Sequence, residues 1–234
     1  MLAVLSILKL ILILSWSMVA ILIATVTYLF TWSPRIPVFL AKHLWSRIML
    51  FLLGARIKVY GKENLRKGEH YLVMANHTSY ADIPTLFRAL PLYLRFIGKD
   101  ELRSVPFLGF YMKLAGMIFI NRKNAREGRE TIMSAAHTAK SGKNVVIFPE
   151  GTTIEGDQIA PFKRGLQLLA NEAQSTILPV RIKGTHRVWP SDTNLKIRGG
   201  KISVYIGKPI PYNEYKDLST SEFLKKMKGA VEAL

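Results

Sequence analysis

Cysteine is absent from the 234 residues of this chain. Without it no disulfide, thiolate metal site or thiol nucleophile can form. Glycine and proline are not enriched, with 16 and 11 residues, and hydrophobic residues make up 49% of the chain. This composition excludes collagen-like, low-complexity and disordered proteins, so we expect a folded chain with one main domain.

Acidic residues are missing from the first 62 positions, which hold seven basic residues. Within this part, residues 10–32 carry no charge and are rich in isoleucine, leucine and valine. About 20 such residues suffice to cross the hydrocarbon core of a bilayer. A secretory signal peptide is the competing interpretation, but its apolar core is only about 7 to 15 residues long. The pattern therefore predicts a membrane anchor.

A second apolar stretch, residues 38–53, follows a break at residues 34–37. Lys42, His43, Ser46 and Arg47 are spaced to share one helical face, which predicts an amphipathic helix at the membrane interface. A soluble core helix with one wet face is the alternative. We expect residues 1–53 to form membrane-anchoring helices and residues 54–234 the main domain.

The net charge of +17 points to a polyanionic partner: nucleic acid, an anionic membrane surface, or an acidic protein or substrate. Basic residues gather on the C-terminal side of the first apolar run. By the positive-inside rule, this predicts a bacterial-type inner (cytoplasmic) membrane location, with the main domain on the cytoplasmic side.

Beyond residue 54, short β-branched runs alternate with helix-like stretches. The expected strands are residues 56–60, 71–75, 96–99, 117–121, 145–148, 177–182 and 202–206. The expected helices are residues 83–89, 101–114, 125–140, 163–172 and 222–234. This alternation predicts an α/β fold with a largely parallel sheet flanked by helices, whose ligands bind beyond the carboxyl ends of the strands.

Asn76, His77 and Asp82 follow the expected strand at residues 71–75. A tight turn into a helix would bring the Asp82 carboxylate back onto the imidazole of His77, fixing its tautomer and leaving Nε2 free as a base. Such a base suits the deprotonation of an alcohol. The alternative is that Asn76 and Asp82 are turn and capping residues around an incidental histidine.

Cations and a glycine turn follow the next strands. Arg122 comes after residues 117–121, and its guanidinium suits a phosphate, although a lone arginine there is more often a solvated surface residue. Gly151, after residues 145–148, allows the backbone to approach a ligand closely. Lys163 and Arg164 stand where a helix is expected to begin, so that two cations and free amides face one anion.

These blocks, in this order, resemble the 1-acylglycerol-3-phosphate acyltransferase family of membrane glycerolipid acyltransferases. The matching blocks are Asn76-His77-x4-Asp82, Phe119-Ile120-x-Arg122, Phe148-Pro149-Glu150-Gly151-Thr152 and Leu178-Pro179-Val180. The resemblance implies transfer of a fatty acyl group from acyl carrier protein or coenzyme A to the hydroxyl of a lysophospholipid, at a membrane, with no cofactor, no metal and no nucleic acid.

The resemblance also implies roles. His77 corresponds to the catalytic base and Asp82 to the carboxylate that orients it. Arg122 corresponds to a phosphate ligand, Glu150, Gly151 and Thr152 to part of the acceptor site, and Pro179 to the fourth block, which shapes the site. Together with Asn76 of the first block and the two cations Lys163 and Arg164, these are the substrate-binding residues that we expect. The absence of cysteine fits direct attack of the alcohol on the thioester, without an acyl-enzyme.

One position departs from the family pattern. Thr153 stands where many members that use lysophosphatidate have arginine, so another lysolipid acceptor, such as a lyso-ornithine lipid, stays open beside 1-acyl-sn-glycerol 3-phosphate. Two non-enzymatic alternatives are a basic nucleic-acid-binding protein and a membrane scaffold with a degenerate site. We expect neither, because nucleic-acid-binding motifs are lacking and His77 and Asp82 are intact.

Overall fold

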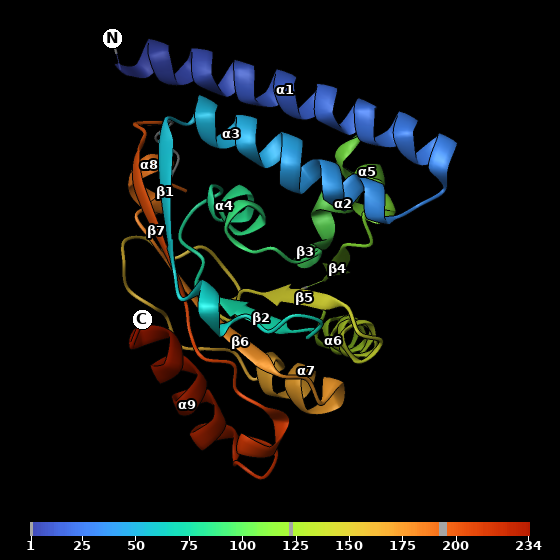
Figure 1. Cartoon of the computed structure of the whole chain (residues 1–234), viewed down its shortest axis with the longest axis vertical. Helices are drawn as coiled ribbons and strands as arrows, with labels where there is room; N and C mark the ends of the chain where they lie inside the picture. Colours follow the sequence, from blue (N-terminus) through green and yellow to red (C-terminus); the bar gives the residue numbers. More distant parts are fainter. Residues whose placement is uncertain (1, 122–123, 192–195) are drawn as a thin grey trace.

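A seven-stranded sheet forms the centre of the molecule (Figure 1), which the computed structural model describes over residues 2–121, 124–191 and 196–234. The strand order is β1-β7-β6-β2-β5-β3-β4, and every pair is parallel except β6 with β7. The strands are β1 (Ala55–Tyr60), β2 (Leu72–Ala75), β3 (Leu94–Lys99), β4 (Ile118–Ile120), β5 (Asn144–Ile147), β6 (Ile177–Lys183) and β7 (Gly200–Ile206). The predicted α/β fold with a largely parallel sheet is confirmed.

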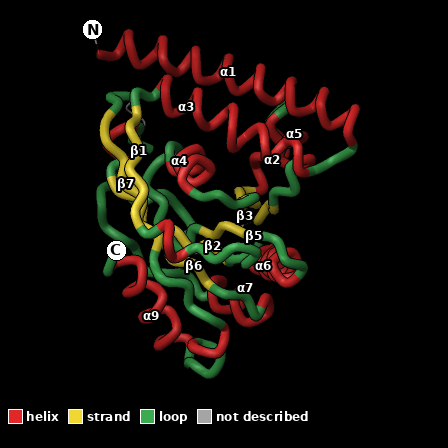
Figure 2. The backbone as a smooth tube through the Cα atoms, in the orientation of Figure 1, coloured by secondary structure: helices red, strands yellow, loops and turns green. Residues whose placement is uncertain are grey.

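Helices cover both faces of the sheet (Figures 1 and 2). On one side lie α4 (Asp82–Ala89) and α5 (Leu108–Leu114), and on the other α6 (Ala125–Lys140), α7 (Gly165–Ala173) and α9 (Thr220–Glu232). Side-chain caps define two of the starts: Asn124 accepts the amides of Arg126 and Glu127 at α6, and Ser219 forms a capping box with Glu222 at α9. A short helix, α8 (Thr185–Val188), follows β6 and was not predicted.

The predicted helix at residues 101–114 is broken into two. A 3-10 helix spans Asp100–Ser104, and α5 begins only at Leu108. Pro106 explains the break, because a proline disfavours helical backbone in the residue before it and lacks the amide that a helix interior needs. Val105 is accordingly extended.

The two N-terminal helices lie one above the other on the α4 side of the sheet (Figure 1). The first is α1 (Leu2–Thr31). The second runs through α2 (Arg35–Leu40), a π-helical turn (Ala41–Trp45) and α3 (Ser46–Leu52). Among the described residues, only the first contains a stretch long and apolar enough to cross a membrane, Ala3–Thr31.

The second helix is amphipathic, but Ser46 does not share the exposed face predicted for it. Lys42, His43 and Arg47 are at least partly exposed, whereas Ser46 is fully buried and its hydroxyl donates to the Lys42 carbonyl at 2.7 Å. Trp45 lines a cavity between this helix and the rest of the fold, and its indole N–H donates to the Ser17 hydroxyl on α1 at 3.1 Å. The π-helical turn that contains Trp45 sets this orientation, because its wider spacing rotates the following residues relative to an α-helical wheel.

Two hydrophobic cores fill the two sides of the sheet. The core on the α4 side includes Ile13 of α1, Met49 and Leu53 together with Val73 and Leu178 of the sheet. The N-terminal helices thus pack into the same core as the sheet. The division into anchoring helices over residues 1–53 and a main domain over residues 54–234 stays a prediction.

Candidate active site

His77 and Asp82 meet at the turn between β2 and α4. The His77 Nδ1 atom lies 2.8 Å from the Asp82 Oδ2 atom, and the His77 side chain is 17% exposed while that of Asp82 is fully buried. None of the described residues hydrogen bonds to the Nε2 atom. The contact expected from the five-residue spacing is present, and it leaves Nε2 as the ring nitrogen available to a substrate.

The turn is shaped around the Asp82 carboxylate. The backbone amides of Thr78 and Ser79 donate to Oδ2 at 2.7 and 2.9 Å. The Thr185 hydroxyl of α8 donates to Oδ1 at 2.5 Å. Asp82 therefore closes the turn, begins α4 and orients His77 at once, which a fully buried carboxylate can do only with this many donors.

Asn76 connects two neighbouring strands. Its side-chain amide donates to the Ile182 carbonyl at 2.9 Å, and its side-chain oxygen accepts the Ile182 amide at 2.7 Å. Both polar atoms of this buried side chain are thus used to join the end of β2 to β6. The arrangement supports the turn that carries His77, and the predicted substrate contact of Asn76 stays a prediction.

An aromatic ring holds the other side of the His77 imidazole. Phe148, directly after β5, stacks on His77 with ring centroids 4.1 Å apart and an interplanar angle of 15°. The Ile154 amide donates to the His77 carbonyl at 2.8 Å. The imidazole is therefore fixed by a carboxylate at Nδ1 and by stacking across its face.

Lys163 lies across the turn at Gly151. Gly151 has φ +75°, and a Cβ atom added there would come 2.9 Å from the Lys163 Cε atom, so a larger residue would displace the lysine. The Lys163 amide also donates to the Pro149 carbonyl at 2.9 Å. Arg164 is exposed at the N-terminus of α7, and Thr152 is exposed beside the turn. The structure thus brings the Lys163 ammonium to the glycine turn.

Two predicted residues lie elsewhere. Arg122 falls outside the described residues. Pro179 is buried within β6, paired in register with Met74 of β2, so it lies inside the sheet near the end of β2. Among the described residues there is no group of three or more His, Asp or Glu side chains that could hold a metal ion.

Glu150 is a buried acid at the start of the Gly151 turn. It is 2% exposed, and neither carboxyl oxygen makes a well-formed hydrogen bond to a described residue. The pKa of Glu150 is raised to about 8, chiefly by burial; the nearby His77 backbone opposes this increase, the charge of Asp82 adds to it, and the charge of Lys228 lowers the pKa slightly. At neutral pH this carboxyl is mostly protonated and can donate a hydrogen bond.

The raised pKa of Glu150 makes the stability of the fold depend on pH. In the unfolded chain the carboxyl ionises near pH 4.5, whereas in the fold it keeps its proton to about pH 8. The unfolded state thus binds fewer protons within this window, so stability is greatest below it and falls by up to about 1.4 kcal/mol per pH unit as pH rises through it. We expect Glu150→Gln to melt higher relative to wild type at pH 8.5 than at pH 5. Thermal melts of the two proteins test this, with Glu155→Gln on the exposed loop as the control; an equal difference at both pH values would contradict it.

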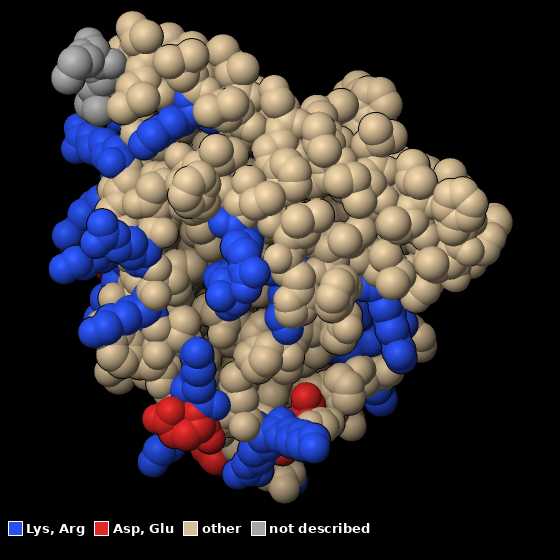
Figure 3. All heavy atoms as spheres, turned by 45° about the horizontal axis from the view of Figure 1, so that its top comes forward, with Lys and Arg blue, Asp and Glu red and all other residues tan. Residues whose placement is uncertain are grey.

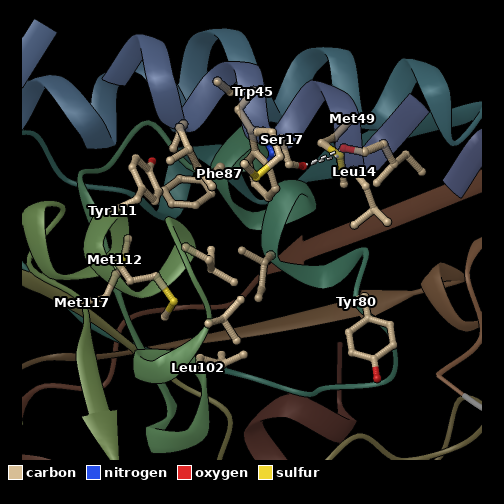
Figure 4. Close-up of a pocket in the computed structure, with 18 of the residues that line it drawn as sticks. Leu14, Ser17, Trp45, Met49, Tyr80, Phe87, Leu102, Tyr111, Met112 and Met117 are labelled. Atoms are coloured by element: carbon tan, nitrogen blue, oxygen red, sulfur yellow. Dashed lines mark hydrogen bonds between the residues drawn. The ribbon is translucent and has the colours of Figure 1, made fainter. Parts of the chain in front are cut away.

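A hydrophobic cavity of about 580 Å³ adjoins the turn that carries His77 (Figure 4). It lies between the N-terminal helices on one side and α4, α5 and β3 on the other. Tyr80, Phe96 and Trp189 are among its lining residues. The Ser79 hydroxyl donates to the Trp189 carbonyl, and the Phe96 ring lies 6.2 Å from the Phe148 ring that stacks on His77. The cavity walls are therefore continuous with the site.

Sequence reasoning missed two contributors. Thr185 is 103 positions from Asp82, and nothing in its local sequence marks it as a partner of that carboxylate. The stacking role of Phe148 was also missed, although its place at the end of β5, beside the end of β2, is a signal that sequence alone contains.

Known proteins of similar sequence include 1-acyl-sn-glycerol-3-phosphate acyltransferases. A 1-acyl-sn-glycerol-3-phosphate acyltransferase of Saccharomyces cerevisiae is 34% identical over 184 residues, which cover 77% of this chain and 60% of the relative. One of Bacillus subtilis is 28% identical over 186 residues, covering 79% and 88%. The chain spans 60% and 54% of the first two relatives that it matches, which are longer proteins.

The fold has a solved counterpart. The crystal structure of the 1-acyl-sn-glycerophosphate acyltransferase PlsC from Thermotoga maritima matches with a TM-score of 0.81 at 23% identity, covering 100% of this chain and 97% of that one. The sequence model of the Acyltransferase family matches residues 56–183, which include the His77 turn, the Gly151 turn and β6. By this match, and in agreement with the motifs, the chain belongs to the acyltransferase family.

Proposed function

We propose that this protein transfers a fatty acyl group from a thioester donor to the sn-2 hydroxyl of 1-acyl-sn-glycerol 3-phosphate, making phosphatidic acid for phospholipid biosynthesis. The observation that carries the proposal is the His77–Asp82 pair beside a hydrophobic cavity. A base with one free nitrogen suits an alcohol, and an apolar cavity suits an acyl chain. The relatives' names agree with this reaction.

The chemistry assigned to His77 is general-base catalysis. Its Nε2 atom takes the hydroxyl proton of the acceptor as that oxygen attacks the thioester carbonyl carbon. The C–S bond then breaks, the acyl group stays on the acceptor oxygen, and the proton passes from His77 to the leaving thiolate. Asp82 stabilises the imidazolium that forms between these steps.

The acceptor phosphate is assigned to the cations at the sheet edge. Lys163 lies over the Gly151 turn, and Arg164 stands at the N-terminus of α7, where helix amides also favour an anion. Position 153 holds a threonine where many family members that use lysophosphatidate have an arginine. Lys163 and Arg164 are assigned to supply the positive charge that this arginine would provide. Arg122 is assigned to the same phosphate on the family resemblance, and Glu150, Gly151 and Thr152 to the acceptor site.

The membrane surface is assigned to the face of α1 and the second helix. Exposed hydrophobic side chains run along α1 and continue at Phe39 and Phe51. Figure 3 shows a broad uncharged surface bordered by lysine and arginine, with acidic side chains gathered at the opposite end. Each well-placed cation contributes about 1 kcal/mol toward an anionic leaflet. The domain is assigned to the cytoplasmic side, where anionic lipids and acyl donors meet.

The α1 helix is fastened along the domain. The Ser6 hydroxyl accepts the Ile197 amide at 3.1 Å, and the Lys9 ammonium donates to the Ile197 carbonyl at 3.5 Å. Trp16 donates to the Trp45 carbonyl at 3.4 Å. One face of α1 is thus held against the protein while the other is free for lipid, so the proposed acyl cavity opens within reach of the bilayer.

A panel of acceptors and donors tests the proposed function. The purified protein is placed in vesicles that contain phosphatidylglycerol. The acyl donor is a radiolabelled fatty acyl group carried either on acyl carrier protein or on coenzyme A, and the acceptor is lysophosphatidate, lysophosphatidylglycerol or lyso-ornithine lipid. We expect product from lysophosphatidate. Because Thr153 stands where many family members have arginine, a lyso-ornithine lipid is the second candidate acceptor. If the enzyme prefers this acceptor, phosphatidic acid is not its main product. Absence of product from every pair would contradict the enzymatic proposal.

Narrowing the cavity is expected to shorten the acyl chains that the enzyme uses. Ala20 on α1 is 8% exposed and lines the cavity, so Ala20→Leu fills space that two or three methylenes would occupy. At about 0.8 kcal/mol per methylene, the kcat/KM ratio of the longest to shorter acyl substrates should fall by about tenfold or more. The ratio in a mixed-chain competition assay measures this. Ala3→Leu, the same change at an exposed position of α1, is the control. An unchanged chain preference in Ala20→Leu would show that the acyl chain lies elsewhere.

A further inference from the structure

Thr185, which is distant in the sequence, hydrogen bonds to Asp82 of the proposed catalytic pair. It is the first residue of α8 and is fully buried. Its hydroxyl lies 2.5 Å from the Asp82 Oδ1 atom and 2.9 Å from the Thr78 hydroxyl. The other three donors to Asp82, from His77, Thr78 and Ser79, all reach Oδ2. Among the described residues, Thr185 is the one hydrogen-bond donor to Oδ1.

The protons of this cluster have a defined order. A hydroxyl carries one hydrogen, and an ionised carboxylate can only accept. When Thr185 donates to Asp82, the Thr78 hydroxyl must therefore donate to Thr185. The chain runs from Thr78 to Thr185 to Asp82, and each bond strengthens the next by polarisation.

The position of Thr185 is itself fixed. Gly184, with φ +92°, lies so close to β7 that an added Cβ would come 2.5 Å from the Lys201 carbonyl oxygen. On the outer side of α8, Arg187 forms an ion pair with Asp157 at 2.7 Å. Asp157 belongs to the loop that follows the Gly151 turn, so α8 is held between β7 and this loop. The Thr185 hydroxyl therefore has little freedom to move away from Asp82.

We propose that Thr185 is a positioning residue of the acyl transfer, acting through Asp82: its hydroxyl holds Oδ1 so that Oδ2 faces His77 Nδ1. The inference rests on the proposed function, because it presumes that His77 is the base. Without the hydroxyl, Oδ1 loses its donor inside the protein, and the carboxylate can turn away from the geometry that orients the imidazole. A loss of orientation of this kind lowers the rate of the chemical step and leaves substrate binding unchanged.

Three substitutions at position 185 test the proposal. Thr185→Val keeps the shape and removes the hydroxyl, Thr185→Ala removes it without a branched side chain, and Thr185→Ser keeps it. With the acceptor and donor that give product, we expect Thr185→Val and Thr185→Ala to lower kcat by about tenfold to a hundredfold, by analogy with the loss when the hydrogen-bond partner of a metal-binding residue is removed. KM for both substrates should stay within about twofold of wild type, and Thr185→Ser should restore most of kcat.

The control is Thr85→Val. Thr85 is also a fully buried threonine, on the same helix as Asp82, but its hydroxyl has no hydrogen-bond partner among the described residues. The same chemical change there should leave kcat near the wild-type value. Thermal melts of every variant identify loss of fold, and Thr185→Ala answers the question if Thr185→Val does not fold.

Two results would overturn the inference. One is a wild-type kcat in the folded variants that lack the hydroxyl; the other is a Thr185→Ser variant as slow as Thr185→Val. His77→Ala, measured in parallel, separates this failure from a failure of the proposed function. If His77→Ala is inactive and Thr185→Val is normal, only the positioning role is wrong. If His77→Ala is as active as wild type, the assignment of the base is wrong, and the inference falls with it.

Discussion

In purified His77→Ala, kcat for acyl transfer is expected to fall by roughly 10²- to 10⁴-fold, the span that general-base catalysis usually supplies. Alanine removes the group proposed to take the acceptor proton while leaving the Asp82 carboxylate bonded to the Thr78 and Ser79 amides and the Thr185 hydroxyl. The turn and α4 therefore keep their anchor, and KM should change little. Steady-state kinetics with saturating acyl donor and a range of acceptor concentrations measure both constants.

The matched control for this change is His137→Ala. His137 is an exposed histidine on α6, on the opposite side of the sheet from α4. Its loss should leave kcat unchanged, because it touches neither the His77 turn nor the cavity. A His77→Ala protein that folds and keeps most of its activity would show that another group takes the proton.

The parts of the site that the sequence predicts are those built from local spacing and strand ends. Five residues from His77 to Asp82, at the end of a buried strand, are enough to bring the carboxylate onto the imidazole. The fold class predicts that the carboxyl ends of β2 and β5 lie at the same edge of the sheet, while the observed strand order makes these two strands neighbours and so brings the residues after β5 to His77.

The parts that the sequence does not predict depend on distant contacts. Thr185 approaches Asp82 only because β6 pairs with β2 and turns directly into α8. Trp45 faces the cavity because a π-helical turn shifts it from the face that a regular helix would present. A π-helical turn contains one more residue than an α-helical turn, and the hydrophobic periodicity of 3.6 residues does not reveal it.

The site combines two environments at one edge of the sheet. On the α4 side, the cavity offers hydrocarbon contacts that suit an acyl chain. On the other, the Gly151 turn, Lys163 and Arg164 offer charge and backbone groups that suit a phosphate. His77 lies between them, with one face stacked on Phe148. An amphipathic lysolipid has its hydroxyl between its chain and its headgroup, so this order of groups matches the order of groups in the proposed substrate.

Asp82→Asn is expected to lower kcat by roughly 10²- to 10³-fold, the usual cost of removing one preorganised electrostatic contact, again with little change in KM. Three donors converge on Oδ2, so the asparagine oxygen should take that place and its amide nitrogen the place of Oδ1. The Thr185 hydroxyl can rotate to accept from that nitrogen and donate to Thr78. The hydrogen bond to His77 Nδ1 thus survives, but the negative charge that is proposed to stabilise the imidazolium does not.

This reasoning also predicts an order among variants: the loss in Asp82→Asn should exceed that in Thr185→Val, because the first removes the charge and the second only loosens its placement. Asp217→Asn, at a side chain that is 87% exposed, is the control for the chemical change and should keep the wild-type kcat. Equal losses in Asp82→Asn and Thr185→Val would mean that placement, not charge, carries the contribution of Asp82. Unchanged kcat in a folded Asp82→Asn protein would mean that the imidazolium needs no counterion, and the mechanism assigned to the pair would then be wrong.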